Sequence, residues 1–143
     1  MLAFAIWVAL IPVDAERHTL LTGMLTEAPM WLAAVWVVFR VFGSSIVVPI
    51  VEELAFRGGL QPVLQDIIPE SCPNHLRTIL AVLGSAIAFG LLHSDILAGI
   101  LVGILYGGVV WRTGKVLDAI VAHAITNFLI CVLVLGVGYW SYW

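Results

Sequence analysis

The stretch "VPIVEELAFRGGL", residues 48–60, places the charged side chains of Glu52, Glu53 and Arg57 in the middle of an apolar run. In a soluble protein these side chains would form an ordinary solvated helix face. The whole chain excludes that interpretation, because 62% of its 143 residues are hydrophobic and 10% are charged, against roughly 45–50% and about 25% in soluble domains. The composition therefore predicts an integral membrane protein with these charges at membrane depth.

Long apolar segments alternate with polar stretches, which predicts an all-α bundle of transmembrane helices. Each segment is near the length of about 20 residues that crosses a hydrocarbon core of about 30 Å. The segments are residues 31–50, 76–92, 96–111 and 117–139, separated by the polar stretch 14–29, the loop 66–75 and short turns. Residues 1–13 are too short to span and are expected to be a membrane helix that is short or cut off. Residues 1–143 are expected to form a single integral membrane domain.

Pro49 lies just before the charged side chains. Proline lacks a backbone donor and is tolerated best in the first turn of a helix. We therefore expect the helix to break at Pro49 and a new helix to run over residues 50–65. Such a start would place Glu52 and Glu53 near a helix N-terminus, where the dipole favours anions.

Three glycines, Gly99, Gly103 and Gly107, recur at intervals of four within the expected helix 96–111. A stripe of small residues lets helix backbones approach closely in membranes. We interpret this stripe as a packing surface and assign no ligand site to it.

Ionisable residues inside the apolar segments supply the candidate site, because each costs about 2.5 to 3.5 kcal/mol at a helix centre. Glu53 and Arg57 are four residues apart, in the order that favours an ion pair, so Arg57 is expected to act as a structural clamp. Glu52 points about 100° away from Glu53 and is left for chemistry. Arg40 is less informative, because a cation near a segment end can extend its charged group to the membrane surface.

Two further pairs repeat the spacing of four residues. Phe89 and His93 place an aromatic ring on the same helix face as an imidazole, and His123 and Asn127 place an imidazole beside an amide. Spacing alone does not bring the helices together. If they converge, a carboxylate and an imidazole can activate water, and the His–Asn pair can donate hydrogen bonds to a tetrahedral oxyanion. Such a hydrolysis needs no nucleophilic side chain.

These residues carry three motifs of a known family. "EELAFR" resembles its EExxxR motif, "FGLLH" its FxxxH motif and "HAITN" its HxxxN motif, in the expected order over roughly residues 47–129. The chain thus resembles the CAAX prenyl protease and bacteriocin-processing (CPBP) family, also called the Abi family, of intramembrane glutamate proteases. Its C-terminal third looks like the subgroup linked to bacterial exosortase protein-sorting systems.

The resemblance implies an intramembrane endopeptidase whose helical bundle encloses a membrane-embedded polar cavity. It implies that Glu52 and His93 activate water. It further implies that His123 and Asn127 form the oxyanion hole. The implied site residues are the catalytic Glu52, His93, His123 and Asn127 and the supporting Glu53, Arg57 and Phe89. The expected partners are a membrane-associated peptide or protein substrate, the lipid bilayer and an exosortase-type sorting system, and the expected location is the bacterial inner membrane.

Other interpretations stay open. A non-catalytic immunity or peptide-binding membrane protein would keep the same pocket for binding. A metal-dependent protease would use Glu52, His93 and His123 as ligands, although the HExxH motif is absent, and haem between the two histidines is a further alternative. Ser85 and Ser94 lie in no nucleophile motif. We expect no metal and no cofactor, and the few scattered basic residues exclude nucleic acid as a partner.

Overall fold

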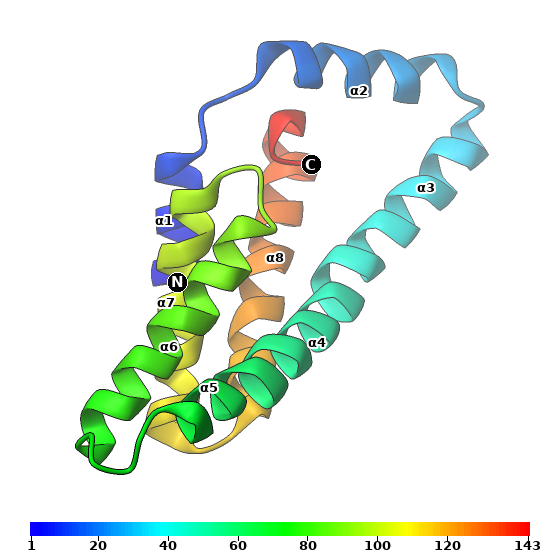
Figure 1. Ribbon diagram of the computed structural model, residues 1–143. Coiled ribbons are helices and arrows are strands. Elements are labelled where there is room, and N and C mark those ends of the chain that lie inside the picture. Colours follow the sequence, from blue (N-terminus) through cyan, green and yellow to red (C-terminus); the bar gives the residue numbers. More distant parts are fainter.

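The computed structural model describes all 143 residues, and the protein is all-α (Figure 1). The elements are α1 (Leu2–Leu10), α2 (Ala15–Glu27), a long helix over Met30–Ile67, α6 (Asn74–Leu91), α7 (Ile96–Thr113), α8 (Val116–Val137) and the short 3-10 helix η3 (Trp140–Tyr142). The long helix, α6, α7 and α8 are long and apolar enough to cross a membrane. The chain is therefore an integral membrane protein.

The last three spans and α1 pack side by side, while the long helix runs diagonally past them (Figure 1). The expected helices 76–92, 96–111 and 117–139 are confirmed, and each end differs by two residues or fewer from α6, α7 or α8. The expected loop 66–75 is also confirmed in its central part, because no helix covers residues 68–73. Long apolar runs bounded by proline and polar residues are therefore sufficient to predict these spans.

The helix break expected at Pro49 is wrong. The long helix is continuous and contains, in order, α3 (Met30–Phe42), the π-helical segment η1 (Gly43–Val47), α4 (Val48–Glu53), the π-helical segment η2 (Leu54–Leu60) and α5 (Gln61–Ile67). Pro49 and Pro62 each lie two residues after the end of a π-helical segment. Glu52 and Glu53 consequently lie in the interior of the long helix and not at its start.

The two π-helical segments account for the continuity of the long helix. A proline ring clashes with the carbonyl group one turn earlier in a regular α-helix and leaves that carbonyl without a donor. In a π-helical turn the hydrogen bonds run from residue i to residue i+5, which widens the turn. The widened turn before each proline therefore relieves the clash without ending the helix.

The polar stretch 14–29 contains a helix, α2, that the pattern of apolar residues did not predict. Asp14 is its N-cap, and the Oδ1 atom of Asp14 accepts a hydrogen bond from the backbone N–H of Arg17 at 2.9 Å. This is the preferred way to satisfy a free N–H group in the first turn. The helix lies across the open end of the molecule, between α1 and the start of the long helix (Figure 1).

The packing role expected for the glycine stripe is confirmed. A Cβ atom added to Gly99 would lie 2.8 Å from the Cα atom of Gly90 in α6, and one added to Gly103 would lie 3.1 Å from the Cα atom of Ala86. A Cβ atom added to Gly107 would meet side chains, since Oε1 of Gln61 and Cγ1 of Val82 would each lie 3.0 Å away. The absence of side chains along this face thus lets α6 and α7 pack with their backbones almost in contact.

We predict that Gly99→Ala destabilises the protein, because the added methyl group would meet the backbone of Gly90 and not a movable side chain. Overpacking of this kind costs roughly 1–3 kcal/mol of unfolding free energy. Thermal unfolding of the detergent-solubilised protein would measure the loss as a lower midpoint. Gly108→Ala on the same helix is the matched control, since its added Cβ meets no atom within 4 Å. Equal midpoints for the two variants would contradict the packing interpretation.

Candidate active site

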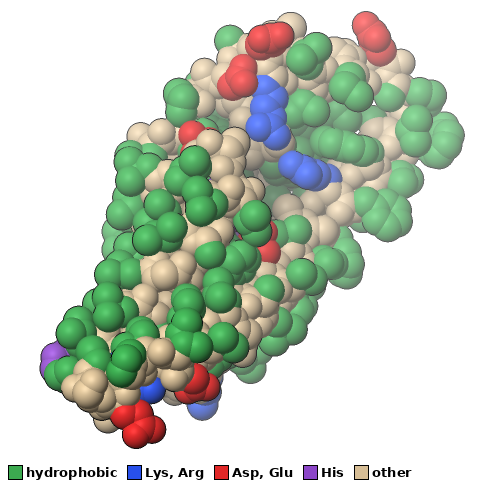
Figure 2. Space-filling model, viewed as in Figure 1, with side chains coloured by type: hydrophobic (Ala, Val, Ile, Leu, Met, Phe, Trp, Pro, Cys, Tyr) green, Lys and Arg blue, Asp and Glu red, His purple; other side chains and the backbone are tan.

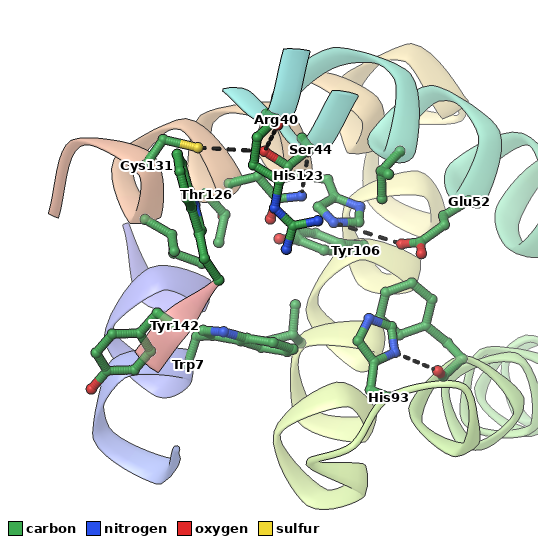
Figure 3. A pocket seen from close by; sticks show the side chains of 16 residues that line it. Trp7, Arg40, Ser44, Glu52, His93, Tyr106, His123, Thr126, Cys131 and Tyr142 are labelled. Carbon is green, nitrogen blue, oxygen red and sulfur yellow. Dashed lines mark hydrogen bonds and ion pairs between the residues drawn. The ribbon is translucent and has the colours of Figure 1, made fainter. Parts of the chain in front are cut away.

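The residues selected from the sequence gather around one cavity of about 150 Å³ (Figure 3). Glu52, Phe89, His93, His123 and Asn127 line it, and Glu53 and Arg57 are buried behind its wall. The long helix, the end of α6 and α8 each contribute to this set. A cavity of this size holds several water molecules.

The ion pair expected between Glu53 and Arg57 is confirmed. Nη1 of Arg57 lies 3.0 Å from Oε1 of Glu53, and both side chains are fully buried. Nη2 of Arg57 donates a hydrogen bond to the carbonyl oxygen of Gly103 at 2.9 Å. The Cζ atom of Arg57 also lies 4.4 Å from the ring centroid of Phe89, within the range of a cation–π contact. The ion pair therefore connects the long helix to α6 and α7.

His123 meets the same carboxylate group. Its Nδ1 atom lies 2.9 Å from Oε1 of Glu53, and its Nε2 atom lies 3.8 Å from Oε2 of Glu52. The first distance is a hydrogen bond, and the second is too long for one. Because an ionised Glu53 only accepts, Nδ1 of His123 carries the hydrogen, which leaves Nε2 as the ring atom next to Glu52. The ring of Tyr106 stacks on the imidazole at a centroid distance of 4.7 Å.

Glu52 and His93 both line the cavity, and no hydrogen bond or salt bridge joins them. The side chain of Glu52 is 25% exposed, and its Oε2 atom forms no hydrogen bond with the protein. Nδ1 of His93 lies 2.8 Å from the carbonyl oxygen of Phe89, and it must donate because a carbonyl oxygen can only accept. Nε2 of a neutral His93 is then free to accept a proton.

The expectation that His93 lies on the same helix face as Phe89 is only partly correct. The helix α6 ends at Leu91, and His93 lies in the turn that leads to α7. The two rings nevertheless approach to a centroid distance of 4.5 Å. The carbonyl oxygen of Phe89 also accepts a hydrogen bond from the backbone N–H of Leu92 at 3.2 Å, so the imidazole of His93 is a second donor to this group at the end of α6.

Asn127 joins α8 to the π-helical segment η1. Its Nδ2 atom donates a hydrogen bond to the carbonyl oxygen of Ser44 at 2.8 Å. This bond uses one of the two amide hydrogens, so the other hydrogen is still available to a ligand in the cavity. The structure thus brings His123 and Asn127 to the same cavity, as their spacing on one helix predicted.

Several residues that line the cavity were missed. Tyr106 stacks on His123, and the ring of Trp7 lies edge-on to His93 at a centroid distance of 5.6 Å. Arg40 and Trp143 complete the wall near α2. A charge within an apolar run was a signal for Arg40, although its position had suggested a segment end. The sequence holds no comparable signal for Trp7 or Trp143.

The histidines and carboxylates do not form a metal-binding cluster. No group of three His, Cys, Asp or Glu side chains is arranged to hold a metal ion. Glu52, His93 and His123, the ligands that a metal-dependent protease would use, line the same cavity but do not converge on one point. The geometry therefore gives the metal-dependent alternative no support.

A sequence model of the family described as "Type II CAAX prenyl endopeptidase Rce1-like" matches residues 29–129. The matched region runs from the residue before the long helix to the middle of α8 and covers more than two thirds of the chain. It includes all seven residues selected above. No curated protein and no solved structure matches the chain.

We predict that Arg57→Ala strongly destabilises the protein, because it would leave the buried carboxylate of Glu53 without its cation. Removing one partner of a buried ion pair costs about 3–5 kcal/mol of unfolding free energy, whereas replacing both by apolar residues costs much less. Equilibrium unfolding in mixed micelles would compare Arg57→Ala with the double variant Glu53→Leu, Arg57→Met. Arg112→Ala is the control, since Arg112 is exposed at the end of α7. A loss no larger than that of Arg112→Ala would refute this role.

Proposed function

The chain belongs to the Rce1-like family of type II CAAX prenyl endopeptidases, and on that premise we propose how it hydrolyses its substrate. Membership implies an intramembrane protease that acts on a protein. We propose that Glu52 and His93 activate a water molecule that attacks a peptide bond of a membrane-associated substrate. The observation that carries this proposal is that the partly exposed side chain of Glu52 lines the same cavity as His93, His123 and Asn127.

The proposed reaction needs one base and one water molecule. As the water oxygen attacks the carbonyl carbon of the substrate, its proton passes to Glu52 or to the free Nε2 atom of His93. The new C–O bond forms while the electron pair of the carbonyl π bond moves to the carbonyl oxygen. The same base then returns the proton to the amide nitrogen as the C–N bond breaks, and a carboxylic acid and an amine leave.

The developing oxyanion is assigned to His123 and Asn127. Glu53 accepts the hydrogen of Nδ1, so His123 presents Nε2 to the cavity and donates from that atom when the ring is an imidazolium. The second amide hydrogen of Asn127 supplies the other donor. Such preorganised donors act on charge that exists only in the transition state. Arg57 and Phe89 act indirectly, because Arg57 holds Glu53 in place and Phe89 packs between Arg57 and His93.

We also propose the location of the enzyme, its domain organisation and its partner. We place it in the bacterial inner membrane, with residues 1–143 as a single integral membrane domain and a family-like core of about 47–129. The resemblance of the C-terminal third to exosortase-associated members supports a substrate or partner in an exosortase-type sorting system. We also propose a metal-independent reaction, because no three His, Cys, Asp or Glu side chains are grouped to hold a metal ion.

We predict that Glu52→Gln and His93→Ala each lower kcat by about 10²- to 10⁴-fold, the usual contribution of general acid–base catalysis. Mass spectrometry of new protein termini would measure turnover after co-reconstitution with membrane proteins of the source cell. Glu70→Gln and His75→Ala are matched controls, since both residues are exposed and outside the cavity. Unchanged turnover in either active-site variant would overturn the assignment. Peptide binding that survives Glu52→Gln, with no cleavage by the wild type, would favour the immunity or peptide-binding alternative.

We predict that Asn127→Ala lowers kcat by about 10²- to 10³-fold with little change in KM, because an oxyanion donor acts mainly in the transition state. The same turnover assay, run over a range of substrate concentrations, separates the two constants. Asn74→Ala, at the exposed start of α6, controls for the loss of an amide. A rise in KM with kcat unchanged would show that Asn127 binds the ground state and would remove it from the oxyanion hole.

A further inference from the structure

Two arginines near the cavity have no charged partner. Arg17 in α2 and Arg40 in α3 line a second pocket beneath α2. No carboxylate contacts either guanidinium group, and the side-chain hydrogen bonds of the protein involve only their backbone atoms. By contrast, Arg57 pairs with Glu53. The guanidinium groups of Arg17 and Arg40 are therefore free to bind an anion.

The second pocket shares two lining residues with the active-site cavity. Arg40 and Trp143 line both spaces, and Arg40 is drawn in the cavity wall together with Glu52 and His123 (Figure 3). Basic side chains also gather beside the hollow beneath α2 in the space-filling view (Figure 2). A ligand in the cavity can thus reach Arg40 without leaving the space that contains Glu52.

Arg40 is a cation without a charged partner inside an apolar membrane span. It lies ten residues after Met30, about 15 Å along the long helix, within the candidate span Met30–Ile67. An arginine within a membrane span is expensive unless it faces a cavity or an anion. The Cζ atom of Arg40 lies 5.9 Å from the ring centroid of Trp143, and this ring helps to direct the guanidinium group toward the cavity and not toward lipid.

We propose that Arg40, with Arg17, forms a subsite for a carboxylate of the peptide substrate, either an acidic side chain or the C-terminal carboxylate. A guanidinium group matches a carboxylate with two parallel hydrogen bonds. The rest of the pocket is apolar and consists of Leu20, Leu21, Met24, Trp36 and Trp143. The subsite therefore selects an apolar peptide with a carboxylate a few residues from the scissile bond. This inference rests on the proposed hydrolysis and names the residues that would recognise a carboxylate of its substrate.

The test uses the full chain in phosphatidylcholine nanodiscs and two matched pools of synthetic apolar peptides. One arm compares peptides with Glu and with Gln at each position, and the other compares free and amidated C-termini. We expect the carboxylate peptides to be cleaved with about tenfold higher kcat/KM. Arg40→Gln should bring the ratio of kcat/KM between carboxylate and neutral peptides close to one, mainly through KM. Arg40→Glu should lower this ratio below one and should favour peptides with Lys at the same position. The arm that responds identifies the source of the carboxylate.

Matched variants separate charge recognition from damage to the fold. Arg40→Lys should retain the preference in reduced form, and Arg112→Gln, at the opposite end of the bundle, should leave it unchanged. Equal cleavage of the two pools by the wild type, or a ratio that Arg40→Glu does not alter, would overturn the subsite. A third result would assign the arginines to lipid: the two pools are cleaved equally in phosphatidylcholine, and the protein retains phosphatidylglycerol unless Arg40→Gln is introduced. This result would also overturn the subsite.

A binding measurement distinguishes failure of the subsite from failure of the proposed hydrolysis. Immobilised nanodiscs that contain the Glu52→Gln variant should retain carboxylate peptides in preference to their amides, and the preference should disappear when Arg40→Gln is added. Retention without cleavage by the wild type would refute the hydrolysis and support the subsite. Cleavage without a charge preference would refute the subsite alone, and the absence of both retention and cleavage would refute both.

Discussion

One buried carboxylate group, that of Glu53, holds the site together. Its Oε1 atom contacts Nη1 of Arg57 at 3.0 Å and Nδ1 of His123 at 2.9 Å. Arg57 extends the network to the carbonyl oxygen of Gly103. A charge in the interior of a membrane protein is tolerated only with partners such as these. The same group that fixes the long helix against α7 and α8 therefore also determines which nitrogen of His123 faces Glu52.

The sequence was sufficient for features that depend on local spacing. Apolar runs of about 20 residues predicted α6, α7 and α8, and the interval of four residues predicted the ion pair of Glu53 and Arg57. Gly99 and Gly103 likewise indicated a close helix contact before its partner helix was known. The hydrogen bond from His123 to Glu53 joins residues 70 positions apart, and no helical periodicity contains that information. Only the motifs shared with a known family suggested that these helices meet.

Local sequence rules gave wrong predictions at positions where another part of the structure compensates for the expected effect. Proline ends most helices, but the widened turns of η1 and η2 allow the helix to continue through Pro49 and Pro62. His93 was expected on the same helix face as Phe89, yet it lies beyond the end of α6, and its Nδ1 atom donates back to the carbonyl oxygen of Phe89. Both outcomes depend on where individual carbonyl groups find donors. Residue type and spacing do not specify those partners.

The charged side chains of the long helix differ in whether they have a partner of opposite charge. Glu53 and Arg57 are fully buried and neutralise each other, whereas Glu52 is partly exposed and Arg40 is exposed, and no salt bridge joins these two. Glu52 and Arg40 carry opposite charges and line one cavity. If they touched, each would neutralise the other, and neither would act on a ligand. In the proposed mechanism, their separation suits an extended peptide whose carbonyl group would meet the attacking water beside Glu52 while its own carboxylate would meet Arg40.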